Sequence, residues 1–252
     1  MKILFMMLDH HSVVGESKAS QNTWIKDISE KHELLILGDK KMPNEINSFE
    51  VYKPLETENR ASITEKIVKS FEYTLGKSWD YIIRLDTDVY CNVKNLIDFL
   101  KFNNKKIPLY CGQGIHFPNS THPCYLSNPE SPHPTNPYYY FAQGGCYVLS
   151  RDALEKSLDY MFYPAPLESE AEDIVVGIAT KKAGINLQDR PDLFNCGYEG
   201  WGWGPEDCDI RNHTTQEHID KIKSNYISTH KVTAQQIYEI HNSLMHRNDC
   251  GN

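Results

Sequence analysis

The chain has 252 residues, 40% of them hydrophobic and 24% charged, which is typical of a soluble globular protein with room for one large α/β domain. The formal net charge of −8 argues against a basic surface for nucleic acid or another polyanion. No apolar run approaches the roughly 18 residues that a membrane span needs, so no transmembrane segment is predicted.

The amino terminus, Met1–Leu8, is apolar but continues directly into Asp9-His10-His11 with no small-residue cleavage site. We therefore interpret it as the first strand of the fold and not as a signal peptide. The seven cysteines show no C-x-x-C spacing, which favours neither a zinc cluster nor a disulfide framework. This pattern fits a reducing compartment, with one or two disulfides left open.

The first half of the chain alternates between strand and helix patterns. Apolar runs bounded by polar residues indicate strands at 2–8, 33–38 and 79–85. Apolar residues at helical spacing indicate helices at 15–31, 61–76 and 92–103. The alternation predicts an α/β fold with a mostly parallel sheet and helices on both faces.

The strand at 79–85 ends in two acids separated by one residue, Asp86-Thr87-Asp88. The end of a buried strand lies at the sheet edge where open α/β sheets bind ligands. Carboxylates at i and i+2 repel each other unless a cation or a proton lies between them. A site with few oxygen ligands from the protein, and a phosphate that supplies others, suits Mg²⁺ or Mn²⁺. We therefore predict a cation site here, with a solvated turn as the alternative.

The middle of the chain changes character. Residues 114–137 are rich in proline with histidines between, which predicts a loop with solvated histidines. Residues 138–149 then have a strand pattern interrupted by Gly144-Gly145, which indicates either a bulge or the close approach of a ligand or another backbone. Ser150 has the character of an N-cap, so a short helix should follow it.

A further helix is predicted after Ser169. Ser169 and Glu172 match a capping box, and Gly184 lies where the helix should end. Asp173 is either an ordinary acid of the first helical turn or a general base that projects into a cleft.

Two segments near the carboxyl terminus complete the pattern. The glycine-rich segment 195–209 holds Trp201 and Trp203, whose flat faces suit pyranose rings or could anchor the loop on the core. Residues 226–232 resemble a strand end, and an amphipathic helix through Ile237, Ile240, Leu244 and Met245 follows. A lone histidine such as His230 is more often structural than a ligand, and we place His241 and His246 on the surface.

Taken in order, these segments resemble the fringe and β-1,3-galactosyltransferase type of inverting glycosyltransferase, which includes core-1 synthase-like enzymes and has the GT-A fold. The motifs that carry the resemblance are Asn22-Thr23-Trp24, Lys66, Trp79-Asp80, Asp86-Thr87-Asp88, Gly144–Ser150 with Ala153-Leu154, Glu172-Asp173 four residues before Gly177, and His230. No single motif is enough to indicate this family, but the ordered set of motifs is specific for it.

The resemblance implies a metal-dependent site for a nucleotide sugar. Asp88 and His230 would ligate Mn²⁺ or Mg²⁺, and Asp86 would reach the ribose or a metal-bound water. Asp173 would take the proton of the acceptor hydroxyl. Further contacts are implied for the nucleotide at Asp39, Lys66 and Thr87, and for the substrates at Gly144, Gly145, Glu172, Trp201 and Trp203.

Two departures from the family pattern matter. Family members are usually Golgi proteins with a membrane anchor, whereas this chain begins in its first strand. We expect a soluble, cytoplasmic enzyme of bacterial or viral type, or else the lumenal domain of a Golgi enzyme without its anchor. Secondly, Trp201–Asp209 is similar to the Trp-Gly-Trp-Gly-Gly-Glu-Asp-Asp-Asp signature of β-1,4-galactosyltransferases. Asp207 is therefore a rival base, and we favour Asp173 because the Gly144–Gly177 stretch fits the fringe pattern more completely.

These observations predict one GT-A domain over residues 1–252, with a nucleotide-binding half (1–113) and an acceptor-binding half (114–252). It should move a hexose or N-acetylhexosamine from a UDP-sugar to a carbohydrate hydroxyl, forming a β-glycosidic bond. A nucleotidyltransferase is disfavoured because Leu8–Gly15 lacks a glycine-rich basic phosphate loop. The alternatives are a β-1,4-galactosyltransferase-like enzyme and a non-catalytic sugar-binding module with a structural cation.

Overall fold

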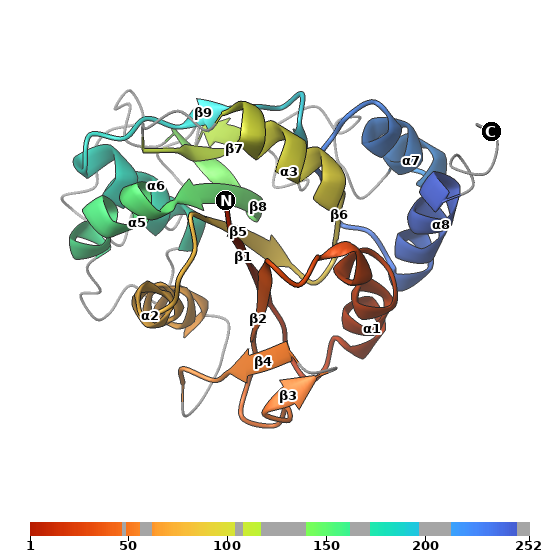
Figure 1. The fold of residues 1–252 in the computed structure, drawn as a ribbon, viewed down its shortest axis with the longest axis horizontal. Helices are drawn as coiled ribbons and strands as arrows, with labels where there is room; N and C mark the ends of the chain where they lie inside the picture. Colours follow the sequence, from red (N-terminus) through yellow and green to blue (C-terminus); the bar gives the residue numbers. More distant parts are fainter. Residues whose placement is uncertain are drawn as a thin grey trace.

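A computed structural model describes residues 1–46, 49–55, 62–103, 108–116, 140–161, 172–196 and 213–245. A central sheet runs through the molecule, and helices lie on both of its faces (Figure 1). This arrangement confirms the predicted α/β fold.

The main sheet has eight strands in the order β3-β4-β2-β1-β5-β8-β7-β9. Their bounds are β1 (Ile3–Leu8), β2 (Glu33–Leu37), β3 (Glu45–Ile46), β4 (Phe49–Tyr52), β5 (Tyr81–Asp86), β7 (Tyr110–His116), β8 (Tyr140–Ser150) and β9 (Gln188–Asp189). The strands β4, β2, β1 and β5 are parallel neighbours, as the alternating pattern predicts. β8 runs antiparallel to both β5 and β7, so the sheet as a whole is mixed.

Two groups of helices bury opposite faces of this sheet (Figure 1). One group is α1 (Val14–Asn22), α3 (Val93–Phe102), α7 (Thr215–Lys223) and α8 (Ala234–Met245), and the other is α2 (Ile63–Leu75), α5 (Arg151–Ser157) and α6 (Glu172–Lys182). Because successive strand residues point to opposite faces, Ile3, Phe5 and Met7 of β1 enter the core on the first side. Leu4 and Met6 enter the core on the second side.

A small second sheet brings distant segments to the end of β5. It has the order β10-β11-β6, with β6 at Val89–Cys91, β10 at Phe194–Asn195 and β11 at Ser228–His230. β11 pairs antiparallel with β6, and the register sets His230 opposite Val89. This pairing joins the carboxyl-terminal part of the chain to the residue that follows Asp88.

Two predicted boundaries are confirmed by the structure. Ser150 caps α5 by accepting a hydrogen bond from the backbone N–H of Ala153 at 3.2 Å. Gly184 has a φ of 77°, the left-handed conformation that favours glycine at a helix end. Ser169, the proposed cap of α6, lies outside the described residues.

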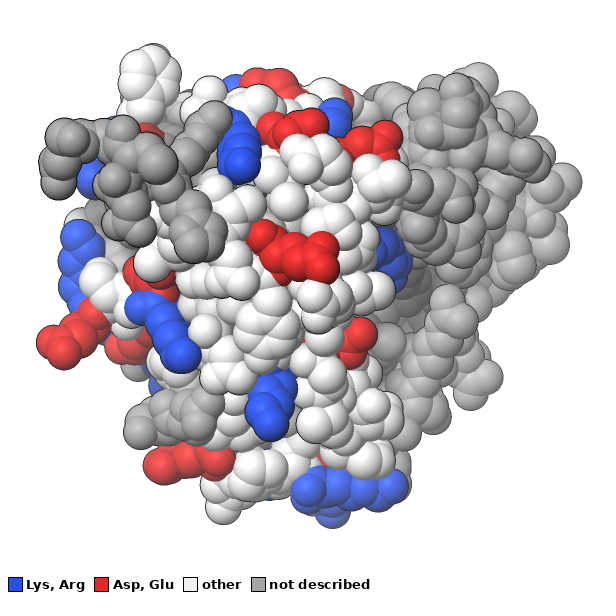
Figure 2. Space-filling model, turned by 90° about the vertical axis from the view of Figure 1, so that its right-hand side faces the viewer, with Lys and Arg blue, Asp and Glu red and all other residues white. Residues whose placement is uncertain are grey.

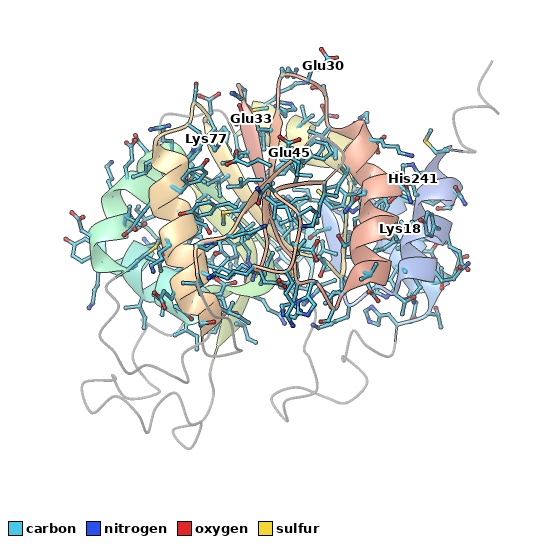
Figure 3. The ribbon with its side chains drawn as sticks, turned by 90° about the horizontal axis from the view of Figure 1, so that it is seen from below. Lys18, Glu30, Glu33, Glu45, Lys77 and His241 are labelled. Carbon is cyan, nitrogen blue, oxygen red and sulfur yellow. The ribbon has the colours of Figure 1, made fainter. Side chains whose placement is uncertain are left out.

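Two predictions need correction. The helix expected at 15–31 ends at Asn22, because Thr23 leaves the helical conformation (φ −122°, ψ −111°) and a 3₁₀ turn follows at Trp24–Asp27. His241 is not a plain surface residue. It lies on α8, next to α1 (Figure 3), and its Nδ1 is 3.1 Å from the hydroxyl of Tyr90.

The described residues add three further observations. The four cysteines among them, Cys91, Cys111, Cys146 and Cys196, are buried free thiols. No helix in the described ranges combines the length and the apolar composition required to cross a bilayer. On the face in Figure 2, basic side chains are scattered among acidic and uncharged ones.

Candidate functional site

Two acids and a histidine meet at the carboxyl end of β5. Asp86 ends that strand, Asp88 lies in the turn that follows, and β11 brings in His230. The Nε2 atom of His230 is 3.2 Å from Oδ1 of Asp88 and 3.5 Å from Oδ2 of Asp86. One possible ligand atom from each residue lies within 4.8 Å of the other two. The sequence resemblance therefore selected three residues that the fold brings together.

The charges in this group favour a bound cation or proton. Burial lowers the pKa of His230, but hydrogen bonds to Asp86 and Asp88 raise it to about 9. Burial raises the pKa of Asp88, but His230 and then Lys231 bring it below its usual range. Carboxylates suit Mg²⁺ or Mn²⁺, whereas imidazole suits transition metals, so this mixed donor set fits Mn²⁺.

A cleft of about 500 Å³ opens beside this group. Its lining comes from the carboxyl ends of β1 and β5, the starts of α1 and α2 and the residue after β11, and includes Asp9, His10, Glu16, Ser62, Lys66, Asp86, Thr87, Asp88 and Lys231. The Nζ atom of Lys231 is 3.2 Å from Oδ2 of Asp88. The position and size of the cleft suit a small polar ligand at the edge of an α/β sheet.

Asp39 lies two residues after β2, with Oδ2 3.5 Å from Nε2 of His10, a residue of the cleft lining. Its carboxylate accepts hydrogen bonds from the backbone N–H of His11 at 2.8 Å and from that of Lys41 at 2.7 Å, and Oδ2 is 2.7 Å from Nδ1 of His11. The rings of His10 and His11 lie 4.2 Å apart. Because its oxygens are used in this way, Asp39 anchors a histidine pair that the sequence alone did not single out.

The glycine pair of β8, Gly144-Gly145, allows side chains of the site to pack closely against this strand. Gly112 of β7 pairs with Tyr147 and Gly114 pairs with Ala142, so β8 bulges between these positions, as one of the two interpretations has it. A Cβ atom on Gly145 would lie 2.4 Å from Nδ1 of His230. The side chains of Asp173 and His230 approach the backbone at Gly144 and Gly145, so larger residues at these two positions of the bulge would clash with them.

Asp173 lies on the other side of the same glycine pair. Its Oδ2 accepts a hydrogen bond of 2.9 Å from the backbone N–H of Gly144. Asp173 therefore packs against Gly144, and His230 packs against the adjacent Gly145. Burial raises the pKa of Asp173 to about 6, and the charge of Asp86 is among the causes of the rise, although the Gly144 N–H and Arg84 oppose it.

Arg84 is a site residue that the motifs did not indicate. Its guanidinium is buried, with Nη1 2.7 Å from Oδ1 of Asp86 and Nη2 2.6 Å from Oε1 of Glu172. Glu172 is itself buried and accepts a hydrogen bond from the hydroxyl of Tyr147 at 3.1 Å. The available signal was a single arginine within the apolar run of β5. Trp201, Trp203 and Asp207 lie outside the described residues.

We expect Gly145→Ala to weaken cation binding. The added methyl would require the His230 ring to move, and such overpacking costs about 1–3 kcal/mol. Mn²⁺ titration by electron paramagnetic resonance should show a higher dissociation constant. Gly15→Ala is the control, because its Cβ would meet only Ala234 at 3.7 Å. Equal Mn²⁺ affinity in both variants would contradict the assignment of His230.

Comparison with known proteins adds independent information. The galactosyltransferase family model matches residues 57–191. The UDP-GalNAc:beta-1,3-N-acetylgalactosaminyltransferase 1 of Rattus norvegicus is 26% identical over 148 residues, and that of Homo sapiens is 27% identical over 151 residues. Each alignment covers 56% of this chain and 43% of the relative, so the chain spans less than half the length of these proteins.

One solved structure supports the fold alone. It is described as a glycosyltransferase involved in the glycosylation of the major capsid of PBCV-1. The two chains share 16% identity with a TM-score of 0.51, over 95% of this chain and 99% of the other.

Proposed function

The chain belongs to the galactosyltransferase family, and from that premise we propose that it transfers a hexose or N-acetylhexosamine from a UDP-sugar to a carbohydrate hydroxyl. The proposed reaction is metal-dependent and inverting, and its product carries a β-glycosidic bond. The meeting of Asp86, Asp88 and His230 beside the cleft, with Asp173 of α6 bonded to Gly144 of β8 and His230 packed against the adjacent Gly145, is the observation that carries this proposal.

The proposed nucleotide half lies within residues 1–113, with His230 and Lys231 added from β11. Asp88 and His230 would hold Mn²⁺ or Mg²⁺, which supplies Lewis-acid stabilisation to the departing diphosphate when bound. Lys66 and Lys231 line the same cleft and add two positive charges for the diphosphate. Asp86 and Thr87 are our candidates for the ribose or a metal-bound water, and Asp39 would act through His10 and His11.

The proposed acceptor half uses Asp173 as the general base. Asp173 accepts the proton of the acceptor hydroxyl, whose oxygen attacks the anomeric carbon as the bond to UDP breaks. This single displacement turns an α-linked donor into a β-linked product. A pKa of about 6 leaves Asp173 ionised at neutral pH while it keeps useful basicity. Sugar contacts by Trp201 and Trp203, and the rival base Asp207, stay predictions.

The proposal is tested by measuring UDP release. UDP-N-acetylgalactosamine is the first donor to try, because the aligned relatives are named for it. We expect release from at least one UDP-sugar in the presence of a glycan acceptor, and loss of that release when EDTA removes divalent cations. Glycan binding without UDP binding or release would favour the sugar-binding module instead.

A further inference from the structure

Arg84 is a buried charged residue at a position where the fold itself does not require a charge. It follows Ile82 and Ile83 and precedes Leu85 in the central strand β5, and its side chain is 3% exposed. A buried guanidinium is costly unless its charge is paired and its donors are used. An apolar side chain of similar size would fill the same space, so the partners of Arg84 should explain its presence.

Those partners come from three different elements. Nη1 is 2.7 Å from Oδ1 of Asp86 on β5, and Nη2 is 2.6 Å from Oε1 of Glu172 on α6. Nη1 also donates to the backbone carbonyl of Gly144 on β8. The planar guanidinium holds its donors in a fixed fork, so these three contacts fix one another's positions.

Each partner belongs to one side of the proposed reaction centre. Asp86 is part of the group with Asp88 and His230, where the cation is proposed. Glu172 directly precedes Asp173, and the backbone N–H of Gly144 donates to Asp173 while the carbonyl of the same residue accepts from Arg84. One buried side chain therefore connects the proposed cation site with the proposed base.

We infer that Arg84 is a positioning residue that fixes the cation group and Asp173 relative to each other, an inference that rests on the proposed function. It is too deeply buried to touch either substrate. Groups behind the metal ligands orient them, and their loss typically changes metal affinity or activity by about 10–100-fold. Lysine keeps the charge but has no fork, so it cannot hold Asp86 and Glu172 in the same geometry.

The test compares Arg84→Lys with the matched control Arg151→Lys. Arg151 also donates to two backbone carbonyls, those of Lys77 and Leu75, and its Nε donates to Glu155, but it lies at the amino end of β5. We expect Arg84→Lys to lower kcat by about 100-fold, because an error of about 1 Å in positioning costs that much. The KM for the UDP-sugar should stay within about threefold of the wild-type KM, since no substrate contact is lost.

Mn²⁺ affinity provides a readout that does not depend on turnover. Paramagnetic resonance should show about tenfold weaker binding in Arg84→Lys and unchanged binding in Arg151→Lys. Thermal unfolding of both variants identifies a purely structural effect. Unchanged kcat and Mn²⁺ affinity in Arg84→Lys would overturn the inference, as would equal losses of kcat and unfolding temperature in both variants. If wild type releases no UDP from any donor, the proposed function fails, and the Mn²⁺ comparison alone decides the role of Arg84.

Discussion

Asp173→Asn is expected to lower kcat by about 10²–10⁴-fold, the usual contribution of a general base, while donor binding is retained. Asparagine has nearly the same shape, and its amide oxygen can still accept the hydrogen bond from Gly144. What it lacks is a group that takes the proton of the acceptor hydroxyl. UDP release under saturating donor and Mn²⁺, together with the dissociation constant of UDP, measures both parts of the expectation.

The pH profile gives a second measurement of the same residue. Because burial raises the pKa of Asp173 to about 6, the carboxylate is protonated below that pH and cannot act as a base. The kcat/KM of wild type should therefore fall about tenfold for each pH unit below 6 and level off above it. Asp173→Asn should lose this acidic limb, because the group that titrates is gone.

Two further variants make the result specific. Asp152→Asn carries the same change in the first turn of the neighbouring helix α5, where the carboxylate is exposed, and should behave as wild type. Asp207→Asn tests the rival base in the tryptophan-rich segment. Full activity of Asp173→Asn with an inactive Asp207→Asn would move the base to that segment and favour the β-1,4-galactosyltransferase-like alternative.

The parts of the fold that could be predicted are those whose signal is local. β1, β2, β5 and α2 each carry their own apolar pattern, and the acids after β5 follow from where a buried strand ends. The helix α7 was missed because Ile219 and Ile222 are its only buried apolar residues, which is too narrow a stripe to stand out. The direction of β8 was missed because antiparallel pairing with β5 depends on the chain connection and not on the strand itself.

The same distinction between local sequence signals and the placement of distant segments applies to the site residues. Asp86 and Asp88 were predicted from the strand end that they follow, whereas the role of His230 was named through the family resemblance, since no spacing in the sequence indicates that β11 pairs with β6. The contact between His11 and Asp39 requires β1 and β2 to be parallel neighbours, so that their carboxyl ends meet. The role of Arg84 requires three elements to be placed together, and its only sequence signal is a charge in an apolar strand.

Asp88→Ala is expected to abolish Mn²⁺-dependent UDP binding and to lower turnover by about 10³-fold or more, because Lewis-acid stabilisation of the leaving diphosphate is worth several kcal/mol. Asp88 supplies one carboxylate of the proposed cation group, and alanine leaves Asp86 and His230 too few ligands to hold the ion. Calorimetric titration of UDP with and without Mn²⁺ measures the loss. Asp98→Ala is the control, since Asp98 is an exposed acid that pairs only with Lys94 and Lys101 among the described residues.

The same variant tests the electrostatics of His230 without any ligand. Hydrogen bonds to Asp86 and Asp88 oppose the effect of burial and raise the pKa of His230 to about 9. Removing Asp88 takes away one of these partners, so the pKa of His230 should fall, and the imidazole should lose its proton at a lower pH than in wild type. NMR titration of the ring resonances in the absence of divalent cations measures this shift. An unchanged His230 titration, together with wild-type UDP binding in Mn²⁺, would show that Asp88 and His230 do not share a cation, because two groups that hold one ion must also sense each other's charge.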